Sequence, residues 1–378
     1  MNNSINDFVN NSQAIINNIS GYIERIEVIR TALTIIAVIY VTLILIGIPG
    51  NLLIIWITLA NKHLRIPINL LVCNLALAGL LIASLRIPIT IFELLFPIQF
   101  ANHYPFTLSV CRLSEIVPGA CVITISLTLM AICIDRYHSI VHPTKYKLRM
   151  NPVKAIIFLI LCWLFAFSFW IPYAFFIRIG SSTRYRYCYT IWPSSPLLDV
   201  RIPNSAYGNI IIPYSKMIYL PLYFILIFLI PITIMTTLYI ITAKKLWHTR
   251  PEHMLTTALN STKPNATTSK RSDNISQDGH RLHARKRIVR IFIACFILFI
   301  FSNLPYYMIT ILIQFGLIPV WSGNSEFVLY RVFILLNYSC VAYNAIIYGY
   351  FNYNFRRKAP RWLQYKCPQC RSARLSAK

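Results

Sequence analysis

The sequence predicts an all-α membrane protein, built as a bundle of seven transmembrane helices. Hydrophobic residues make up 57% of the 378 residues and charged residues only 12%, whereas about a quarter of the residues of a soluble domain are charged. The mean hydropathy is positive. Seven mostly apolar runs each reach the length of about 20 residues that a helix needs to cross a bilayer. A soluble core cannot absorb that much apolar surface, so the runs indicate membrane spans.

The seven runs are expected to be helices, because none alternates with the period of two that is typical of a barrel strand. Their bounds are residues 31–60, 68–96, 111–141, 152–177, 218–242, 288–318 and 327–351. No internal repeat or soluble domain interrupts them, so we expect residues 31–351 to form one transmembrane domain. The polar N-terminus lacks the basic and then apolar pattern of a cleaved signal peptide.

Basic residues set the expected orientation, because Lys and Arg accumulate on the cytoplasmic side of a membrane. With an extracellular N-terminus, most of the 36 basic residues fall in the inner loops and in the tail after residue 351. The formal charge of +25 would elsewhere suggest nucleic acid, but beside membrane spans it favours an anionic inner leaflet. We therefore expect a multi-pass plasma-membrane protein with its N-terminus outside and no nucleic-acid partner.

Two polar segments lie outside the spans. Residues 1–30 are expected to be an extracellular, glycosylated tail, with acceptor triplets that begin at Asn2, Asn10 and Asn18. Residues 247–282 are rich in Ser, Thr, Asn and basic residues and have too few apolar ones to fold alone. We expect them to be a disordered third cytoplasmic loop.

The ten cysteines fall into three groups. Six lie within the apolar runs, where a free thiol packs as a small hydrophobic group. Cys111 and Cys188 are at expected extracellular positions, a compartment that permits a disulfide tying the second outer loop over the bundle. Cys367 and Cys370, in the basic tail 352–378, have half of a zinc-site spacing with no second pair after it, so lipidation and plain reduced thiols are the alternatives.

Polar side chains inside the spans are costly in lipid, so each is a candidate functional residue. Asp135 and Arg136 stand side by side at the inner end of the third helix, where an arginine needs a carboxylate partner. A pair that can open and close suits a switch. The other informative residues of this kind are Asn51, Asn74, Tyr239, Asn303, Asn344 and Tyr348.

Along residues 31–358 the order and spacing of these residues resemble the rhodopsin-like (class A) G-protein-coupled receptor family. Asp135-Arg136-Tyr137, followed by Ile140-Val141-His142-Pro143, is similar to the family's most diagnostic signature. Asn344-Ala345-Ile346-Ile347-Tyr348 resembles the seventh-helix motif, which in the family runs into a short amphipathic eighth helix on the membrane surface. The remaining matches are Gly50-Asn51, Asn74-Leu75-Ala76, Trp163, Pro231 with Tyr239, Phe299, Pro305 and Phe355.

The resemblance implies a ligand-operated exchange factor for heterotrimeric G proteins, with no enzyme activity, catalytic residue, metal or cofactor. In the family, the counterpart of Arg136 is held by the neighbouring acid at rest and is released on activation to meet the G protein. The implied coupling switch is Asp135, Arg136, Tyr137, Tyr239, Asn344 and Tyr348. The implied packing and activation residues are Asn51, Asn74, Trp163, Pro231, Phe299, Asn303 and Pro305. Membrane lipids, arrestin and a receptor kinase are the other expected partners.

Three positions depart from the family pattern. Gly79 stands where the second helix usually has an Asp that helps to hold a sodium ion, so no carboxylate remains there to neutralise the ion. Asn303 replaces a Trp two residues before Pro305, and an amide can hydrogen-bond between helices but cannot act as a bulky aromatic piston. Ala345 replaces a proline, which restores a backbone donor and removes a usual cause of a kink.

The ligand is expected to be a peptide, most simply a neuropeptide. Amine receptors place an aspartate where this chain has Pro118 and Gly119, and opsins place the retinal-binding lysine at Tyr338. The outer loop 178–216 carries alternating Arg and Tyr residues that predict a hairpin of the kind found in peptide interfaces. The candidate ligand contacts are Arg86, Glu93, Arg112, Glu115, Arg184 and Arg186. The first four lie near the outer ends of helices two and three, where pairing with each other is an equally good interpretation.

Two other functions are left open by the sequence. One is a transporter or channel that only resembles the receptor fold, although paired broken helices in two matching halves are absent from the pattern. The other is a receptor-like binding protein that no longer couples, which the departures at Asn303 and Ala345 suggest.

Overall fold

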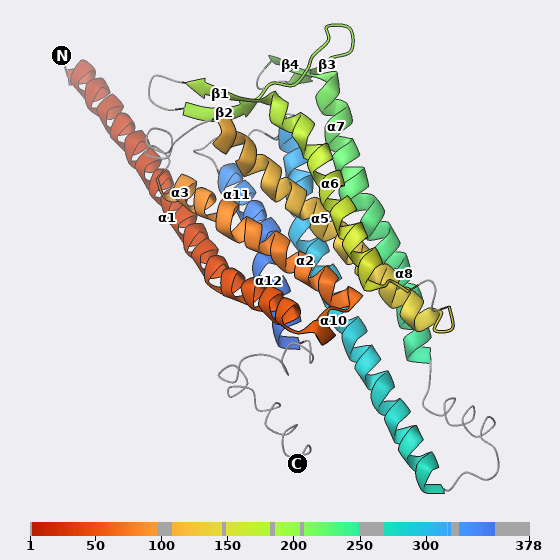
Figure 1. Ribbon diagram of the computed structural model, residues 1–378. Coiled ribbons are helices and arrows are strands. Elements are labelled where there is room, and N and C mark those ends of the chain that lie inside the picture. The colour runs from red at the N-terminus through yellow and green to blue at the C-terminus, as the bar shows by residue number, and fades with distance from the viewer. Residues whose placement is uncertain are drawn as a thin grey trace.

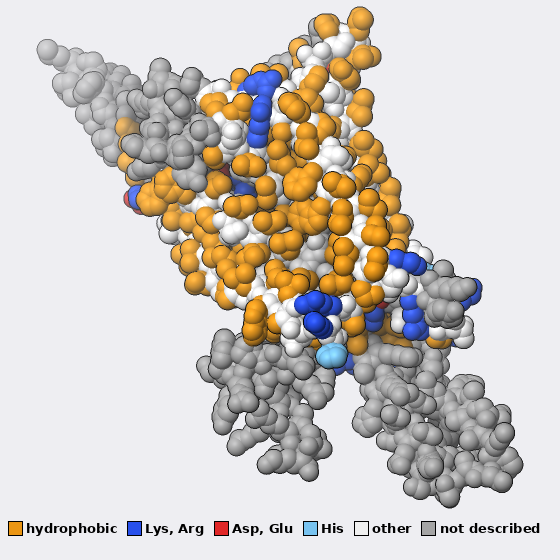
Figure 2. All heavy atoms as spheres, in the orientation of Figure 1, with side chains coloured by type: hydrophobic (Ala, Val, Ile, Leu, Met, Phe, Trp, Pro, Cys, Tyr) orange, Lys and Arg blue, Asp and Glu red, His pale blue; other side chains and the backbone are white. Residues whose placement is uncertain are grey.

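The chain folds as a bundle of seven membrane-crossing helices (Figure 1). The structure is a computed structural model and describes residues 2–96, 108–145, 149–181, 186–204, 208–248, 268–315, 317–318 and 325–351. Within these ranges, seven helices are long and apolar enough to span a bilayer. Hydrophobic side chains cover the middle of the face in Figure 2, and basic side chains lie toward its two ends. The predicted fold class is confirmed.

Four spans are continuous helices and three are interrupted. The continuous ones are α1 (Asn2–Ala60), α5 (Leu108–Val141), α6 (Pro152–Phe176) and α10 (Thr268–Gln314). The second span consists of α2 (Pro67–Leu81), the π-helical turn η2 (Ile82–Arg86) and α3 (Ile87–Leu95), and the short 3-10 turn η1 (Lys62–Leu64) precedes it. The fifth consists of α7 (Tyr214–Phe224), η4 (Ile225–Leu229) and α8 (Ile230–His248), and the seventh of α11 (Ser325–Tyr338), α12 (Cys340–Ile346) and η5 (Ile347–Phe351).

Two β-hairpins lie between the fourth and fifth spans. Strand β1 (Ile177–Ser181) pairs antiparallel with β2 (Arg186–Thr190), which confirms the predicted hairpin in this loop. Strand β3 (Val200–Asn204) pairs in the same way with β4 (Gly208–Ile212) and was not predicted. Between the hairpins, Asp199 Oδ1 accepts hydrogen bonds from the backbone N–H groups of Ser195 and Tyr214, both at 3.0 Å. One carboxylate therefore holds the loop against the start of α7.

The interruption of the fifth span has a local cause. Pro231 has no N–H to donate to the carbonyl of Ile227 four residues earlier, and the π-helical turn η4 falls at this point. Ser126 Oγ, on α5, donates to that carbonyl at 2.7 Å. The backbone acceptor that proline leaves free thus joins the third and fifth spans, as the absence of water in lipid requires.

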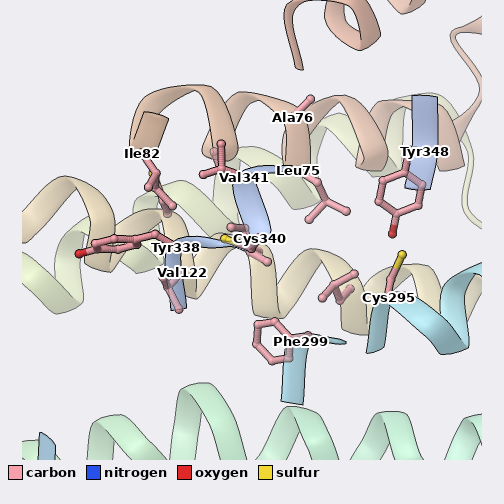
Figure 3. Close-up of a cluster of buried hydrophobic side chains, with 14 of the residues drawn as sticks. Leu75, Ala76, Ile82, Val122, Cys295, Phe299, Tyr338, Cys340, Val341 and Tyr348 are labelled. Atoms are coloured by element: carbon pink, nitrogen blue, oxygen red, sulfur yellow. The ribbon is translucent and has the colours of Figure 1, made fainter. Parts of the chain in front are cut away.

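Helix α5 runs through the centre of the bundle. In its most apolar stretch 78% of the residues are buried, against 17% for α6, which therefore lies at the periphery. Side chains from α2, α5, α10, α11 and α12 meet in one buried cluster (Figure 3). Phe299 is 1% exposed in this cluster, and its ring lies 6.2 Å from that of Phe228. The core of the bundle is thus built on the third span.

Helices α1 and α12 approach closely because small residues face each other. A Cβ added at Gly50 would lie 2.8 Å from Cβ of Ala345, and one added at Gly47 would lie 2.2 Å from a methyl group of Val341. Lipid is as apolar as the side chains, so helices in a membrane gain from close backbone packing of this kind rather than from water exclusion. Ala345, one of the departures from the family pattern, therefore packs directly against Gly50.

We predict that Gly50→Ala lowers the apparent melting temperature of the purified protein by several degrees, because neither Cβ can rotate out of the contact. Overpacking of this kind costs about 1–3 kcal/mol. Gly21→Ala is the matched control, since nothing lies within 4 Å of a Cβ at that position. The double variant Gly50→Ala with Ala345→Gly should regain most of the loss, and a failure to recover would contradict the packing argument.

The structure corrects two predicted boundaries. Helix α1 begins at Asn2, so residues 2–30 of the predicted tail are helical, and the apolar span begins at Ile19 instead of residue 31. Helix α10 begins at Thr268, so the later part of the predicted disordered loop is also helical. Both helices extend from a membrane-embedded segment, and propagation from a formed helix avoids the cost of nucleation. The predicted amphipathic eighth helix, Phe355 and the tail 352–378 with Cys367 and Cys370 lie outside the described residues.

Candidate functional site

The disulfide fixes the outer face of the bundle. Cys111, near the start of α5, is bonded to Cys188 in β2, as predicted. Cys188 faces Ile179 in the register of the first hairpin, and Ile177 packs against Cys111. The hairpin is therefore tied over the end of the central helix.

An open cavity lies among the outer halves of five spans. It is lined from α5, α6, α7, α10 and α11. Its empty space is about 910 Å³ when the part open to solvent is included, and about 130 Å³ of it is accessible to water-sized groups. Seven tyrosines line it, namely Tyr173, Tyr219, Tyr223, Tyr306, Tyr307, Tyr330 and Tyr338. The hydroxyls of Tyr223 and Tyr307 are 3.2 Å apart, which joins the fifth and sixth spans in the wall.

Of the six predicted ligand contacts, only Glu115 lines this cavity in the described part of the chain. Its carboxylate lies 3.7 Å from the guanidinium of Arg86. Glu93 pairs at 2.8 Å with Arg331 of α11, a residue that the sequence interpretation did not single out. Arg112 lies over the ring of Phe175 at 5.9 Å. The alternative that these charges pair is thus confirmed for Arg86 with Glu115, while Glu93 finds its partner on another helix.

The side chains of the remaining candidates on the outer side lie outside the part of the chain that the structure describes. Arg184 lies outside the described residues. Arg186 is at the start of β2, opposite Ser181, and its side chain is outside the description. The same holds for the side chains of the predicted glycosylation sites Asn2, Asn10 and Asn18. Glycosylation and lipidation stay predictions.

In the inner half of the bundle, Asn74 joins three helices. Its Nδ2 donates to Thr128 Oγ1 of α5 at 3.0 Å, and its Oδ1 accepts from Trp163 Nε1 of α6 at 2.9 Å. Thr128 in turn donates to the carbonyl of Thr124 at 2.6 Å. Both the nitrogen and the oxygen of the Asn74 amide are thus hydrogen-bonded to other helices. Asn74 and Trp163 therefore act together in helix packing.

Asn51 lies against Gly79, which is one of the three departures from the family pattern. Asn51 Nδ2 donates to the carbonyls of Gly47 at 2.8 Å and Val341 at 3.0 Å. A Cβ at position 79 would lie 3.0 Å from that nitrogen, so any larger side chain there must displace Asn51. The described neighbours of Asn51 at this point are Gly47, Val341 and Gly79, so none of them brings a carboxylate that could neutralise a cation.

The second departure, Asn303, forms a link between the sixth and seventh spans. Its Oδ1 accepts from Asn337 Nδ2 at 2.8 Å, and its Nδ2 donates to the Phe299 carbonyl at 2.7 Å and to Ser302 Oγ at 3.0 Å. Ser302 Oγ is 3.3 Å from the hydroxyl of Tyr343. The expectation that this amide hydrogen-bonds between helices is met in full.

The seventh span is continuous at Ala345 and broken earlier, at Ser339. Helix α11 ends at Tyr338 and α12 begins at Cys340. Ser339 Oγ donates to the Leu336 carbonyl at 2.6 Å, which competes with the helical backbone pattern. The usual proline kink is thus absent at position 345, as expected, and a break appears about two turns toward the outer face.

The predicted coupling residues gather at the inner end of the bundle. Arg136 Nη2 is 2.5 Å from Asp135 Oδ2, and the carboxylate is 8% exposed. Tyr239 is buried beside the ring of Phe296, within electrostatic reach of Arg136. Tyr348 is 1% exposed, and its hydroxyl points toward the thiol of Cys295 (Figure 3). The arginine is therefore in its held arrangement, with both tyrosines nearby in the protein interior.

Tyr137 and Asn344 differ from the rest of this set. The Tyr137 hydroxyl lies 3.3 Å from Nε2 of His142, so it contacts the first turn of the following loop. Asn344 is 2% exposed, and neither of its amide atoms has a hydrogen-bond partner in the described part of the chain. A buried amide without partners is costly, which makes Asn344 a residue whose bonds can change between states.

Several residues of the site were not identified from the sequence. Arg331 and Asn337 both interrupt the apolar run 327–351, so the rule that polar residues in spans are informative would have found them. The cavity tyrosines give no such signal, because an aromatic residue in a span is ordinary core. Their convergence depends on how five helices are rotated about their axes.

Comparison with known proteins agrees with this geometry. The model of the family described as 7 transmembrane receptor (rhodopsin family) matches residues 50–348. The chain is 26% identical to neuropeptide FF receptor 1 of Rattus norvegicus, over 84% of this chain and 67% of that protein. It is 28% identical to the substance-K receptor of Mus musculus, over 84% and 72%, and 24% identical to the QRFP-like peptide receptor of Branchiostoma floridae, over 91% and 80%.

The chain belongs to the rhodopsin family of seven-transmembrane receptors. It is therefore a G-protein-coupled receptor and a multi-pass protein of the plasma membrane. Among the functions that the sequence left open, the family assignment favours the receptor over the transporter or channel.

We predict that Asn337→Leu lowers the apparent melting temperature, because Asn303 Oδ1 loses its donor inside the bundle. Hydrogen bonds between membrane helices contribute about 0.6 kcal/mol on average, and an unsatisfied buried acceptor adds about 1–3 kcal/mol. Asn303→Leu with Asn337→Leu removes both partners and should be more stable than Asn337→Leu alone. Thr237→Ala is the control, since that exposed hydroxyl donates to the Thr233 carbonyl of its own helix. Strictly additive losses would contradict a direct bond.

Proposed function

We propose that this chain is a plasma-membrane receptor for an extracellular peptide, and that peptide binding in the tyrosine-lined cavity activates a heterotrimeric G protein through Arg136. The protein acts as a receptor and not as an enzyme. Its agonist must bind the active arrangement of helices more tightly than the resting one, because equal affinity for both shifts no equilibrium.

The observation that carries the proposal is the cavity beneath the disulfide-tied hairpin. Tyrosines supply large, rigid contact surfaces with a polar tip, which is why they are common at peptide and protein interfaces. The lining includes Tyr173 and Tyr330 near the outer helix ends and Asn337 deeper in the bundle. An elongated ligand that enters from outside would contact the rim first and the floor last. The relatives named above are receptors for peptides, which supports the same ligand class here.

The inner end supplies the coupling part of the proposal. Asp135 holds Arg136 at rest, and helix movement frees the guanidinium to contact the G protein, with Tyr239 and Tyr348 turning toward it. Lys244, Lys245, Lys286 and Arg287 follow along the inner ends of the fifth and sixth spans, where Lys286 is half-buried and the other three are exposed. This basic rim suits an acidic partner surface.

Further partners follow from the same proposal. Receptor kinase and arrestin would act on the cytoplasmic face after activation. Membrane lipids would surround the exposed apolar side chains that cover the outside of the bundle, including Ile160, Leu161 and Leu164 of α6.

The ligand class is tested by expressing the full chain in cells and measuring G-protein activation against a library of secreted peptides. A receptor-dependent response to at least one peptide is expected. A response only to lipids or small metabolites would overturn the peptide part of the proposal, and binding without any G-protein response would favour the non-coupling receptor.

We predict that Asp135→Asn raises basal G-protein activation, because the amide no longer holds Arg136 by charge. Arg136→Ala should lower agonist-stimulated activation by at least tenfold while the protein still reaches the cell surface. Basal and stimulated nucleotide exchange are measured alongside surface labelling.

Arg149→Ala is the matched control. Arg149 lies in the following inner loop and is exposed, and its Nη2 donates to the Pro143 carbonyl at 3.0 Å. Loss of coupling in this control, or unchanged coupling in Arg136→Ala, would remove the arginine from the mechanism.

A further inference from the structure

We infer that the ligand carries a guanidinium or ammonium group, and that this cation binds the carboxylate of Glu115 within a wall of tyrosine rings. The inference rests on the proposed function, since it names the chemistry of the group that enters the same cavity. It follows from the position of Glu115, its incomplete pairing, and the side chains that surround it.

Glu115 faces the cavity because of its helical position. Glu115, Pro118, Gly119 and Val122 recur at the three- and four-residue spacing that places side chains on one face of a helix, and all four line the cavity. Among the described lining residues, Glu115 is the only one with a formal charge. The cavity thus presents one negative group on an otherwise neutral surface.

The pairing of Glu115 with Arg86 leaves part of the carboxylate available. The two groups are 3.7 Å apart, whereas Glu93 and Arg331 are 2.8 Å apart. The Glu115 side chain is 43% exposed and that of Arg86 only 14%. Arg86 is also within the electrostatic influence of Glu93 and Tyr338. A carboxylate therefore stays in the surroundings of Arg86 if Glu115 turns toward a ligand cation.

Tyrosines from three other spans line the same cavity as Glu115. They are Tyr173 of α6, Tyr306 of α10 and Tyr330 of α11. A cation over an aromatic face gains about 0.5–2 kcal/mol, and more as water is excluded. A carboxylate in a cavity lined by tyrosines suits an organic cation better than an anion or an uncharged group.

An anionic ligand group has less support from the structure. Arg86 is the nearest buried cation, but it does not line the cavity and its side chain is mostly covered. An anionic ligand group would meet Glu115 before it could reach Arg86. Glu115 also lies about one helical turn, or roughly 5 Å, closer to the outside than Pro118, where amine receptors have their aspartate. That height suits a side chain or terminus of a longer ligand that enters from above.

The test measures binding to purified full-length receptor and does not require signalling. The probes are pools of acetylated tetrapeptide amides in which one position is fixed as arginine, lysine, citrulline or glutamate and the others vary. Citrulline has nearly the shape of arginine without its charge. The concentration dependence of the melting temperature gives an apparent Kd for each pool.

We expect the arginine or lysine pools to bind wild type at least tenfold more tightly than the citrulline and glutamate pools. Glu115→Gln should abolish this preference, and Glu115→Asp should keep part of it. Glu326→Gln, an exposed carboxylate on α11, controls for net charge. This control should bind like wild type.

Equal binding of arginine and citrulline pools, a preference for glutamate, an unchanged preference in Glu115→Gln, or no binding of any pool would each overturn the inference. These outcomes are separable from a failure of the proposed function. A peptide agonist without a positive charge keeps the receptor proposal and overturns the cation site. Charge-selective binding to a protein that never activates a G protein keeps the cation site and overturns the receptor proposal.

Discussion

Polar groups inside the bundle must find their partners within the protein, because the surrounding hydrocarbon offers none. That constraint explains the joints between helices. Asn74 binds side chains of two neighbouring helices, Asn303 binds Asn337 across another pair, and Ser126 takes up the backbone carbonyl that Pro231 leaves free. Apolar side chains fill the space between these joints but do not fix helix rotation as strictly, since lipid is an equally good environment for them.

The same constraint distinguishes charged side chains that are paired in this structure from a buried amide that is not. Asp135 and Arg136 form an ion pair at the inner end, and Glu93 and Arg331 form one at the outer end. Asn344 has no partner in the described part of the chain, although it is buried. Because an unsatisfied amide is costly, its retention in the resting arrangement is easiest to explain if it forms bonds in another.

Sequence reasoning succeeded where the determining signal is local. The seven spans follow from length and apolarity, the orientation from basic loops, and the Cys111–Cys188 bond from the compartment of two cysteines. The partner of Glu93 could not be predicted, because helix rotation determines which of several nearby arginines its carboxylate reaches. The break at Ser339 was also missed, since a serine within a span is compatible with an unbroken helix.

The departures from the family pattern carried more information than the matches. Replacing the expected Trp by Asn303 suggested a bond between helices, and the structure provides one to Asn337. Replacing the expected proline by Ala345 suggested a straighter helix there, and α12 is indeed regular at that residue. What the sequence did not reveal is that the helix of the seventh span is interrupted at Ser339, or that Ala345 lies against Gly50.

The hydrogen-bonded residues that connect the ligand cavity with the inner half of the bundle lie near Ser339. Asn337 lines the cavity, and its bond to Asn303 continues through Ser302 to Tyr343, one residue before Asn344. A single bond between helices contributes about 0.6 kcal/mol, whereas moving a two-state equilibrium from one extreme to the other requires about 5.5 kcal/mol. No one contact in this chain is sufficient. Under the proposed function the bond between Asn303 and Asn337 and the pair of Asp135 with Arg136 change together, and we propose that helices α10 and α12 move as packed units about the break at Ser339.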